Sequence, residues 1–430
     1  MKKLVFFIFL LSLFTLLACK EEERVVKPPV VSLIDPLVSS MYYVFDTIFI
    51  KAIISHESSL NTITLSVTNE LLKPVVSSKT LNVNNSNITL DSYLVINNKY
   101  IEDEVHYLLI EMSDNENLFK EWYPIKIQPL SKQLENVLYV TEEGLQHNLY
   151  LISDVNDSSM ITAWNSEYLG GYVDSYHRQF YTSGTITEGI KAYDIDDKKL
   201  NWTIPPKISG TQPYFTAFSA IDGRVSAANR EGVIECFNSE GMKTCITSKR
   251  NNGKYTYVIN SRNFVMGLYT PFSGNIHSFD IYNYPAGSLY QSLELPGIPF
   301  AIVKIDENNF LLFLEKELTI SSYKYSPFEK SLTPLDDITN DKPILKIVGE
   351  GNNIFVLTPN GVLFYRPDLS STVNIFYQSG IENIVYDPID SIIYMIKAHE
   401  IMYSVFPFNY AIKGFDAGLN VKDVLLLYNK

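Results

Sequence analysis

The chain has 430 residues, of which 46% are hydrophobic and 13% aromatic, so it can fill more than one packed core. Its 35 basic and 48 acidic residues give a net charge of −13. Such a chain lacks the basic surface that nucleic acids require, and an anionic membrane surface would repel it. Nucleic-acid binding is therefore excluded.

The first eighteen residues have the pattern of an export signal. Lys2 and Lys3 precede the apolar run 4–17, which is too short to cross a bilayer of roughly 30 Å. Leu16-Leu17-Ala18-Cys19 resembles the lipobox of bacterial lipoproteins. The resemblance implies that residues 1–18 are a cleaved signal peptide and that lipid on Cys19 attaches the mature protein to a membrane. No later stretch is long and apolar enough to span one, so we expect an anchored protein.

Residues 19–28 are expected to be an acidic tether. Lys20-Glu21-Glu22-Glu23-Arg24 follows the cysteine and resembles the surface-export signal of Bacteroidota lipoproteins. That resemblance implies an outer-membrane lipoprotein that faces the cell surface. The alternative is a solvated charged linker with no sorting role.

Residues 29–130 are typical of a β-sandwich with short strands. Several of these strands alternate apolar and polar residues, as half-buried strands do. Asp103-Glu-Val-His-Tyr107 resembles the tyrosine corner of immunoglobulin-like folds, and Tyr107–Asn117 resembles the end of a PKD module. The resemblance implies an Ig/PKD-like domain with a structural role. The expected strands are 30–34, 47–54, 63–67, 75–81, 93–96, 107–112 and 122–127.

Residues 134–430 contain a repeat with a period of 39 to 46 residues. Each unit has an apolar strand, a turn and a second strand, which is typical of propeller blades. The strands begin near Leu138, Phe180, Val225, Phe264, Phe310, Ile354 and Ile393. The sequence thus predicts an all-β chain whose second part is a seven-bladed β-propeller. We expect the C-terminal strand Val421–Tyr428 to complete the first blade, because this removes two exposed sheet edges; a terminal strand on an open sheet is the alternative.

One blade has a further resemblance. Residues Lys191 to Trp202 are similar to the repeat of quinoprotein-type propellers, with Lys198 in the glycine position. The resemblance implies that Trp202 packs between blades. It does not imply a quinone, and we expect no cofactor.

No motif for catalysis or metal binding is present. HExxH, GxSxG and phosphate-binding loops are absent from the sequence, and the six histidines form no close ligand pair. We therefore predict no catalytic residue and no metal site. Cys236 and Cys245 flank a turn-like stretch and would face each other across a hairpin. A disulfide in an oxidising compartment and two free thiols are equally compatible with this spacing.

Aromatic residues in predicted propeller loops are the candidate binding surface. Flat rings with a polar tip suit stacking on sugars or anchoring a protein partner. Gly170-Gly171 indicates that the loop from 168 to 172 is mobile. The candidate binding residues are Tyr168, Tyr172, Tyr176, Tyr214 and Tyr269.

Taken together, the layout resembles the PKD-like lipoproteins of Bacteroidota. That resemblance implies a non-catalytic binding lipoprotein that holds a glycan or a protein, with outer-membrane nutrient-transport proteins as partners. Two alternatives stay open. One is an assembly scaffold that faces the periplasm, and the other is a propeller hydrolase or lyase that acts on polysaccharide.

Overall fold

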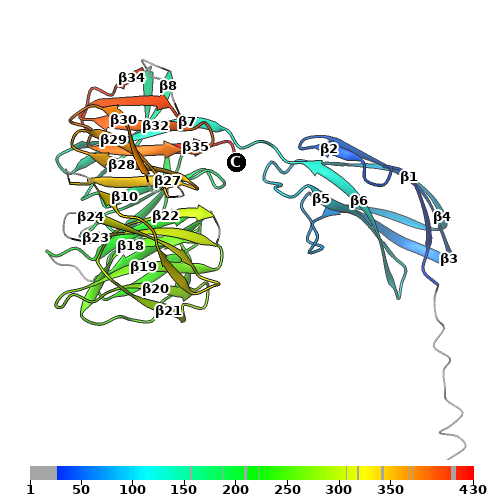
Figure 1. Cartoon of the computed structure of the whole chain (residues 1–430). Coiled ribbons are helices and arrows are strands. Elements are labelled where there is room, and N and C mark those ends of the chain that lie inside the picture. The colour runs from blue at the N-terminus through cyan, green and yellow to red at the C-terminus, as the bar shows by residue number, and fades with distance from the viewer. Residues whose placement is uncertain are drawn as a thin grey trace, which may run out of the picture. The chain divides into compact units, whose positions relative to one another are not determined.

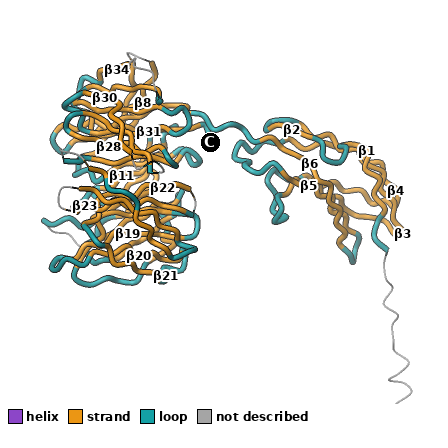
Figure 2. Tube along the Cα trace, viewed as in Figure 1, coloured by secondary structure: helices purple, strands orange, loops and turns teal. Residues whose placement is uncertain are grey.

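The structure is a computed structural model that describes residues 27–154, 157–186, 188–207, 211–221, 223–306, 308–316, 319–339, 343–367, 369, 371–407 and 413–430. Every regular element among these residues is a strand (Figure 2), which confirms the all-β class. Cys19, the signal peptide and most of the 19–28 tether lie outside the described residues. The chain divides into two compact units, Met1–Ser131 and Lys132–Lys430, which are described separately.

The first unit is built from six strands in one hydrogen-bonded sheet. Their order is β1-β3-β5-β6-β2, with β4 paired to β3 and β2 running parallel to β6. The strands are β1 (Val30–Asp35), β2 (Met41–Tyr43), β3 (Thr47–Thr68), β4 (Lys79–Val95), β5 (Val105–Ser113) and β6 (Leu118–Gln128).

The long strands β3 and β4 fold back on themselves, so that this sheet forms two layers. The Nζ of Lys79 lies 4.2 Å from the centre of the Tyr93 ring. An extended strand would separate these two residues of β4 by about 46 Å. Ile50 from the first half of β3 and Leu65 from its second half belong to the same buried core. The two halves therefore enclose one core between them.

Two of the expected strand breaks in this unit are wrong. Strand β3 joins the segments predicted at 47–54 and 63–67, and β4 joins most of those predicted at 75–81 and 93–96. The polar residues between them remain in strand conformation. They are accommodated where the strand pairing shifts register, as between Ser55 and Leu60. Tyr107 of the expected tyrosine corner lies on β5, opposite Thr68 on β3 and Pro124 on β6. The tyrosine corner itself stays a prediction.

The described residues of the second unit form seven antiparallel sheets, six of four strands and one of five (Figure 1). The first sheet has the order β35-β7-β8-β9, and the others follow chain order, with β26 added to β24. The strands are β7 (Leu134–Glu143), β8 (Gln146–Asp154), β9 (Asp157–Asn165), β10 (Gly170–Asp174), β11 (Gln179–Ser183), β12 (Ile190–Asp194), β13 (Lys199–Ile204), β14 (Phe215–Ile221), β15 (Arg224–Asn229), β16 (Val233–Phe237), β17 (Lys243–Ile246), β18 (Gly253–Asn260), β19 (Phe264–Pro271), β20 (His277–Asn283), β21 (Leu289–Leu295), β22 (Ile298–Asp306), β23 (Asn309–Lys316), β24 (Thr319–Ser326), β25 (Ser331–Pro334), β26 (Ile338–Thr339), β27 (Lys346–Glu350), β28 (Asn353–Thr358), β29 (Gly361–Arg366), β30 (Ser371–Tyr377), β31 (Asn383–Asp387), β32 (Ile392–Lys397), β33 (Glu400–Val405), β34 (Lys413–Asp416) and β35 (Val421–Tyr428).

The innermost strands of the seven sheets form a closed ring. They contact one another in the order β10, β14, β18, β22, β27, β31 and β35, and β35 contacts β10 again. The arrangement is propeller-like. Strand β35 pairs antiparallel with β7, with Leu425 opposite Leu138, which confirms the prediction that residues 421–428 complete the first sheet.

One detail of the predicted repeat is also found. Lys198, in the place of the glycine of the quinoprotein repeat, has a φ of +56° between β12 and β13. This is the left-handed region that favours glycine. The Oδ1 of Asp194 accepts a hydrogen bond from the backbone N of Asp197 (2.7 Å), which stabilises the same turn.

Candidate functional site

A cavity of about 710 Å³ lies among the innermost strands of the second unit. Residues from β10, β14, β18, β22, β27, β31 and β35 line it, so it occupies the centre of the ring. We call this cavity the central channel. Its volume falls within the range of sites that hold small molecules.

A cluster of polar side chains lies on one side of the channel. Asn383, the first residue of β31, accepts a hydrogen bond from the Nζ of Lys346, the first residue of β27. The amide of Asn383 donates to the Oδ1 of Asp423 on β35 (3.4 Å). The hydroxyl of Tyr168 donates to the other oxygen of Asp423 (3.0 Å). One amide thus joins an amine to a carboxylate across three neighbouring sheets, and we call these four residues the polar arc.

Burial disfavours both charges of the polar arc. It raises the pKa of Asp423, although Lys346 and the hydrogen bonds from Tyr168 and Asn383 act in the opposite direction. Burial also lowers the pKa of Lys346, against the field of Asp423. These charges therefore cost folding free energy, and perturbed ionisable groups of this kind concentrate at functional sites.

Glu235, in contrast to the polar arc, belongs to a structural ion pair. It is buried, but it accepts hydrogen bonds from Lys207 and from Lys243 (2.8 Å). Although burial opposes ionisation there, the two lysines hold the pKa of Glu235 below its ordinary value. The fold compensates the charge of Glu235 but leaves the charges of the polar arc only partly compensated.

Aromatic side chains line the channel on different strands. Tyr172 on β10, Phe218 on β14 and Tyr257 on β18 come from three neighbouring inner strands. The Tyr172 hydroxyl donates to the carbonyl of Phe218 (3.2 Å), and the two rings meet edge to face at 5.3 Å. We call these three residues the aromatic arc. In the order of the ring, β22 lies between β18 of the aromatic arc and β27 of the polar arc.

Glycine brings Tyr168 close to this site. A Cβ at Gly171 would lie 2.6 Å from the Tyr168 hydroxyl oxygen and 2.8 Å from the ring of Phe180. Only glycine at this position lets Tyr168 reach Asp423. Our expectation of a mobile loop at Gly170-Gly171 is wrong, because both residues belong to β10 and pair with β11.

The five candidate tyrosines are not brought together. Tyr172 lines the channel, and Tyr168 contacts it through Asp423. Tyr176 lies in the turn after β10, is 50% exposed and meets His177 edge to face at 4.6 Å. The expected exposure is wrong for Tyr214 and Tyr269, which are 1% and 4% exposed. Tyr214 packs against Phe215, and Tyr269 packs against Tyr255 and donates to the carbonyl of Asn251.

Sequence reasoning did not find Lys346, Asn383 or Asp423. A usable signal was present for Asp423, since it is the acidic residue of a strand that was already expected to close the ring and whose other residues, Lys422 apart, are apolar or aromatic. An acidic side chain on an inner strand is expected to face the channel rather than the apolar packing between sheets. Lys346 and Asn383 give no such signal, because each opens a strand next to a turn.

The two cysteines lie where the spacing predicts. Cys236 on β16 is directly opposite Cys245 on β17. Both are buried free thiols. The hydrogen bond between them raises the pKa of Cys236 and lowers that of Cys245, so Cys245 ionises first.

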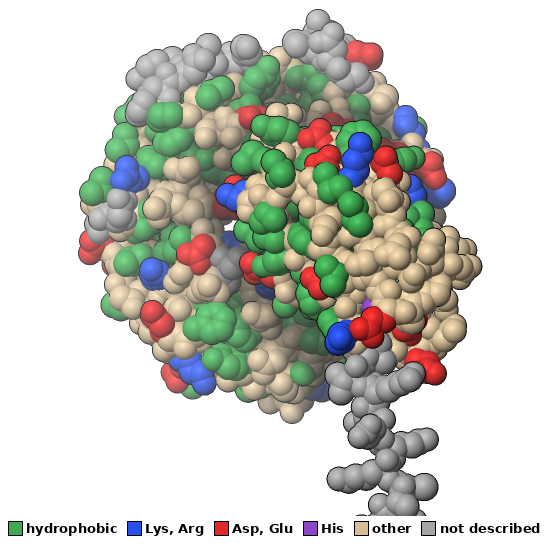
Figure 3. Space-filling model, turned by 90° about the vertical axis from the view of Figure 1, so that its right-hand side faces the viewer, with side chains coloured by type: hydrophobic (Ala, Val, Ile, Leu, Met, Phe, Trp, Pro, Cys, Tyr) green, Lys and Arg blue, Asp and Glu red, His purple; other side chains and the backbone are tan. Residues whose placement is uncertain are grey.

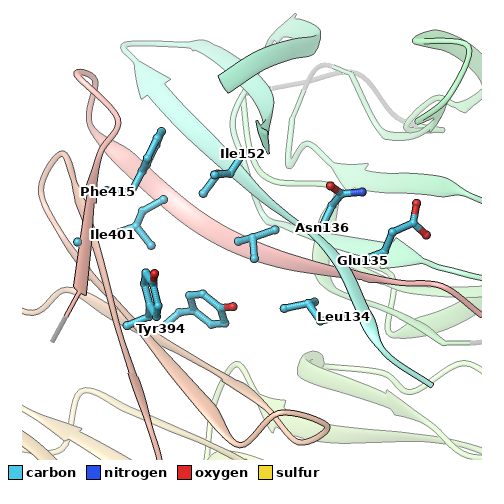
Figure 4. A pocket seen from close by; sticks show the side chains of 10 residues that line it. Leu134, Glu135, Asn136, Ile152, Tyr394, Ile401 and Phe415 are labelled. Atoms are coloured by element: carbon cyan, nitrogen blue, oxygen red, sulfur yellow. The ribbon is translucent and has the colours of Figure 1, made fainter. Parts of the chain in front are cut away.

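A second cavity of about 370 Å³ lies between the first and last sheets (Figure 4). Ile152, Tyr394, Ile401 and Phe415 give it a largely apolar lining. Glu135 at its edge is already paired with Arg178 (2.6 Å). This cleft offers apolar packing, whereas the channel combines charges, an amide and aromatic rings.

Acidic and basic side chains are interspersed on the face that Figure 3 shows. In the part of the chain that the structure describes, no group of three or more His, Cys, Asp or Glu side chains could hold a metal ion. No helix among the described residues is long and apolar enough to cross a membrane.

Comparisons with known proteins bear on the fold alone. No protein-family model matches the chain, and no curated protein is similar to it in sequence. Among solved structures it is similar to a protein from Lactobacillus plantarum, with 15% identity and a TM-score of 0.51 over 69% of this chain and 100% of that one. It also matches the computationally designed Ika8 protein, with 12% identity and a TM-score of 0.47 over 70% and 98% of the two chains. The first likeness supports a propeller-like fold.

Proposed function

We propose that this chain is a lipid-anchored binding protein whose central channel receives a small polar ligand, such as part of a glycan. The observation that carries the proposal is the pairing of the polar arc with the aromatic arc around one cavity of about 710 Å³. Binding sites for small molecules combine apolar walls with a few well-placed polar groups in this way.

The other parts of the chain fit an anchored protein that presents a binding module. The lipobox at Cys19 supports a membrane anchor, and the acidic run after it supports the outer surface of an outer membrane. We propose that the first unit is an Ig/PKD-like spacer, since β1 to β6 enclose one core in two layers. The seven sheets support a seven-bladed propeller as the binding module. Outer-membrane transport proteins are the proposed partners.

The experiment blocks the central channel and the second cleft separately, each by a tryptophan in place of a glycine. Gly170 lines the channel, and a Cβ there would meet only Phe218, at 4.0 Å. Gly414 lines the second cleft, and a Cβ there meets nothing within 4 Å. Gly170→Trp therefore plugs the channel, and Gly414→Trp is the matched plug of the cleft.

The readout is the melting temperature of the full-length protein in detergent with a panel of oligosaccharides and peptides, because a ligand that binds the folded state raises it. We expect at least one compound to raise it in the wild type and in Gly414→Trp, but not in Gly170→Trp. If no compound acts, or if the compounds act equally on Gly170→Trp, the channel is not the binding site.

A further inference from the structure

We propose that the ligand of the central channel is an uncharged polyhydroxy molecule, with saccharides as the chemical class. This inference rests on the proposed function and adds the chemistry of the ligand to it. The juxtaposition that carries it is the amine of Lys346 and the carboxylate of Asp423, joined by Asn383 and facing the same cavity as Tyr172, Phe218 and Tyr257.

A neutral ligand suits the charges of the polar arc. Lys346 and Asp423 carry opposite charges and share one bridging amide, so the polar arc is neutral as a whole. Glu350 lines the channel as well, together with Lys132 and Lys304, so charges of both signs face the cavity. An anionic ligand would face Asp423, and a cationic ligand would face Lys346. Either would bring an additional unpaired charge into a partly dehydrated site, which costs more than a neutral group does.

Hydroxyl groups suit the donors and acceptors of the polar arc. The ammonium group of Lys346 has three donors, and among the described residues it donates one hydrogen bond, to Asn383. The carboxylate of Asp423 accepts from Tyr168, Asn383 and the backbone N of Val424. A hydroxyl group both donates and accepts, so neighbouring hydroxyls of one molecule can serve the amine and the carboxylate together.

The shape of the aromatic arc also suits a sugar ring. The aromatic arc offers ring surfaces, and its hydroxyl groups at Tyr172 and Tyr257 already donate to backbone carbonyls. These side chains therefore act toward a ligand mainly through their apolar faces. A sugar ring has apolar C–H faces and hydroxyls at its edges, which suits an aromatic arc on some strands of the ring and a polar arc on others.

A zwitterion such as a short peptide is the rival ligand class, because its two termini could pair with Asp423 and Lys346. The bridging amide argues against it. Asn383 already occupies the position between the two charges, and a zwitterion would have to lose the hydration of two further charges to enter.

The experiment compares five probes, four tetrasaccharides and one short peptide, with full-length protein in detergent. The probes are neutral maltotetraose and cellotetraose, anionic tetragalacturonate, a cationic glucosamine tetramer, and triglycine as the zwitterion. Binding is measured by titration calorimetry in the wild type and in Gly170→Trp. We expect the neutral saccharides to bind most tightly and to lose binding in Gly170→Trp.

Two variants test the polar arc directly. Asp423→Asn and Lys346→Met should each weaken saccharide binding roughly ten- to hundredfold, as loss of a hydrogen bond to a charged group does. The exposed residues Asp390 and Lys422 provide the controls Asp390→Asn and Lys422→Met, which should leave the affinity unchanged. The melting temperature without ligand reports whether each variant folds.

The outcomes separate the two proposals. Tighter binding of a charged probe or of triglycine, abolished by Gly170→Trp, overturns the neutral-saccharide inference and leaves the channel as the binding site. Binding that Gly170→Trp does not affect overturns the proposed function itself. Saccharide affinity that Asp423→Asn and Lys346→Met leave intact in folded protein overturns the role of the polar arc.

Discussion

The indole Nε1 of Trp202 donates a hydrogen bond to the backbone carbonyl of Ser239, at 2.8 Å, and so joins the outer strand β13 of one sheet to the β16–β17 turn of the next. The ring of Trp202 lies under Gly241, which has a φ of +77°. This is the packing between neighbouring sheets that the repeat around Trp202 implied.

Gly241→Ala should destabilise the second unit by more than the cost of placing an alanine in a left-handed backbone conformation. A left-handed alanine costs about 1–2 kcal/mol, and the new Cβ would lie 2.9 Å from the Trp202 ring. Gly144→Ala is the matched control, with a φ of +64° and nothing within 4 Å of its Cβ. Urea unfolding should show a larger loss for Gly241→Ala; equal losses would mean that the Trp202 contact is unimportant.

Strand β35 should contribute strongly to the stability of the ring. Leu427 on β35 is 0% exposed, so Leu427→Ala should lower the free energy of unfolding by about 2–5 kcal/mol. Leu200 on β13 is 49% exposed, and Leu200→Ala should change it by no more than about 0.5 kcal/mol. Similar effects of the two substitutions in thermal or urea unfolding would argue against closure by β35.

Asp423→Asn should stabilise the protein at neutral pH. Because burial raises the pKa of Asp423, the folded state holds this proton more tightly than the unfolded state does. The cost of ionisation therefore appears as the pH rises through the folded-state pKa. Lys346, Asn383, Tyr168 and Tyr172 are the charged and polar groups that face this carboxylate.

The measurement is the free energy of unfolding of wild type and Asp423→Asn from about pH 4 to about pH 7. The advantage of the variant should grow as the pH rises. Asp390→Asn, at an exposed turn, is the matched control for the substitution itself. If the wild type instead became more stable than Asp423→Asn as the pH rises, the ionised carboxylate would stabilise the folded state and the prediction would be wrong.

The cysteine pair should form a disulfide in protein that has been exported to an oxidising compartment. Cys236 and Cys245 are directly opposite, and Cys245 supplies the thiolate that exchange requires. Mass spectrometry without reductant should show the loss of two hydrogens, and the bond should add about 2–3 kcal/mol of stability for a loop of about ten residues. Alkylation of both thiols in denatured, unreduced protein would contradict this, and Cys245→Ser is the control.

Cys19→Ala should release the protein from the membrane fraction. The proposed function assigns the membrane affinity to lipid on Cys19, because the chain itself is acidic. Fractionation of cells that express the wild type and the variant tests the anchor. Protease treatment of intact wild-type cells tests the surface location, and full protection would favour the alternative of a protein that faces the periplasm.

The fold was more predictable than the site. The repeat in residues 134–430 follows from apolar strands that recur in the sequence, and the closing strand follows from an unpaired edge. The continuity of β3 and β4 was missed because polar residues such as His56 can remain in a bulged strand as well as form a turn. Exposure of Tyr214 and Tyr269 was misjudged, since an amphipathic ring fits an interior equally well when its hydroxyl has a partner there.

The pairing of β35 with β7 also sets an order of folding. Leu425 and Leu138 are 287 residues apart in the chain, so the contact that closes the ring is among the most distant in sequence and the slowest to form. Until residues 421–428 have been synthesised, the edge of β7 stays open to other strands. A chaperone that covers this edge would protect the nascent protein against aggregation at the stage when it is most vulnerable.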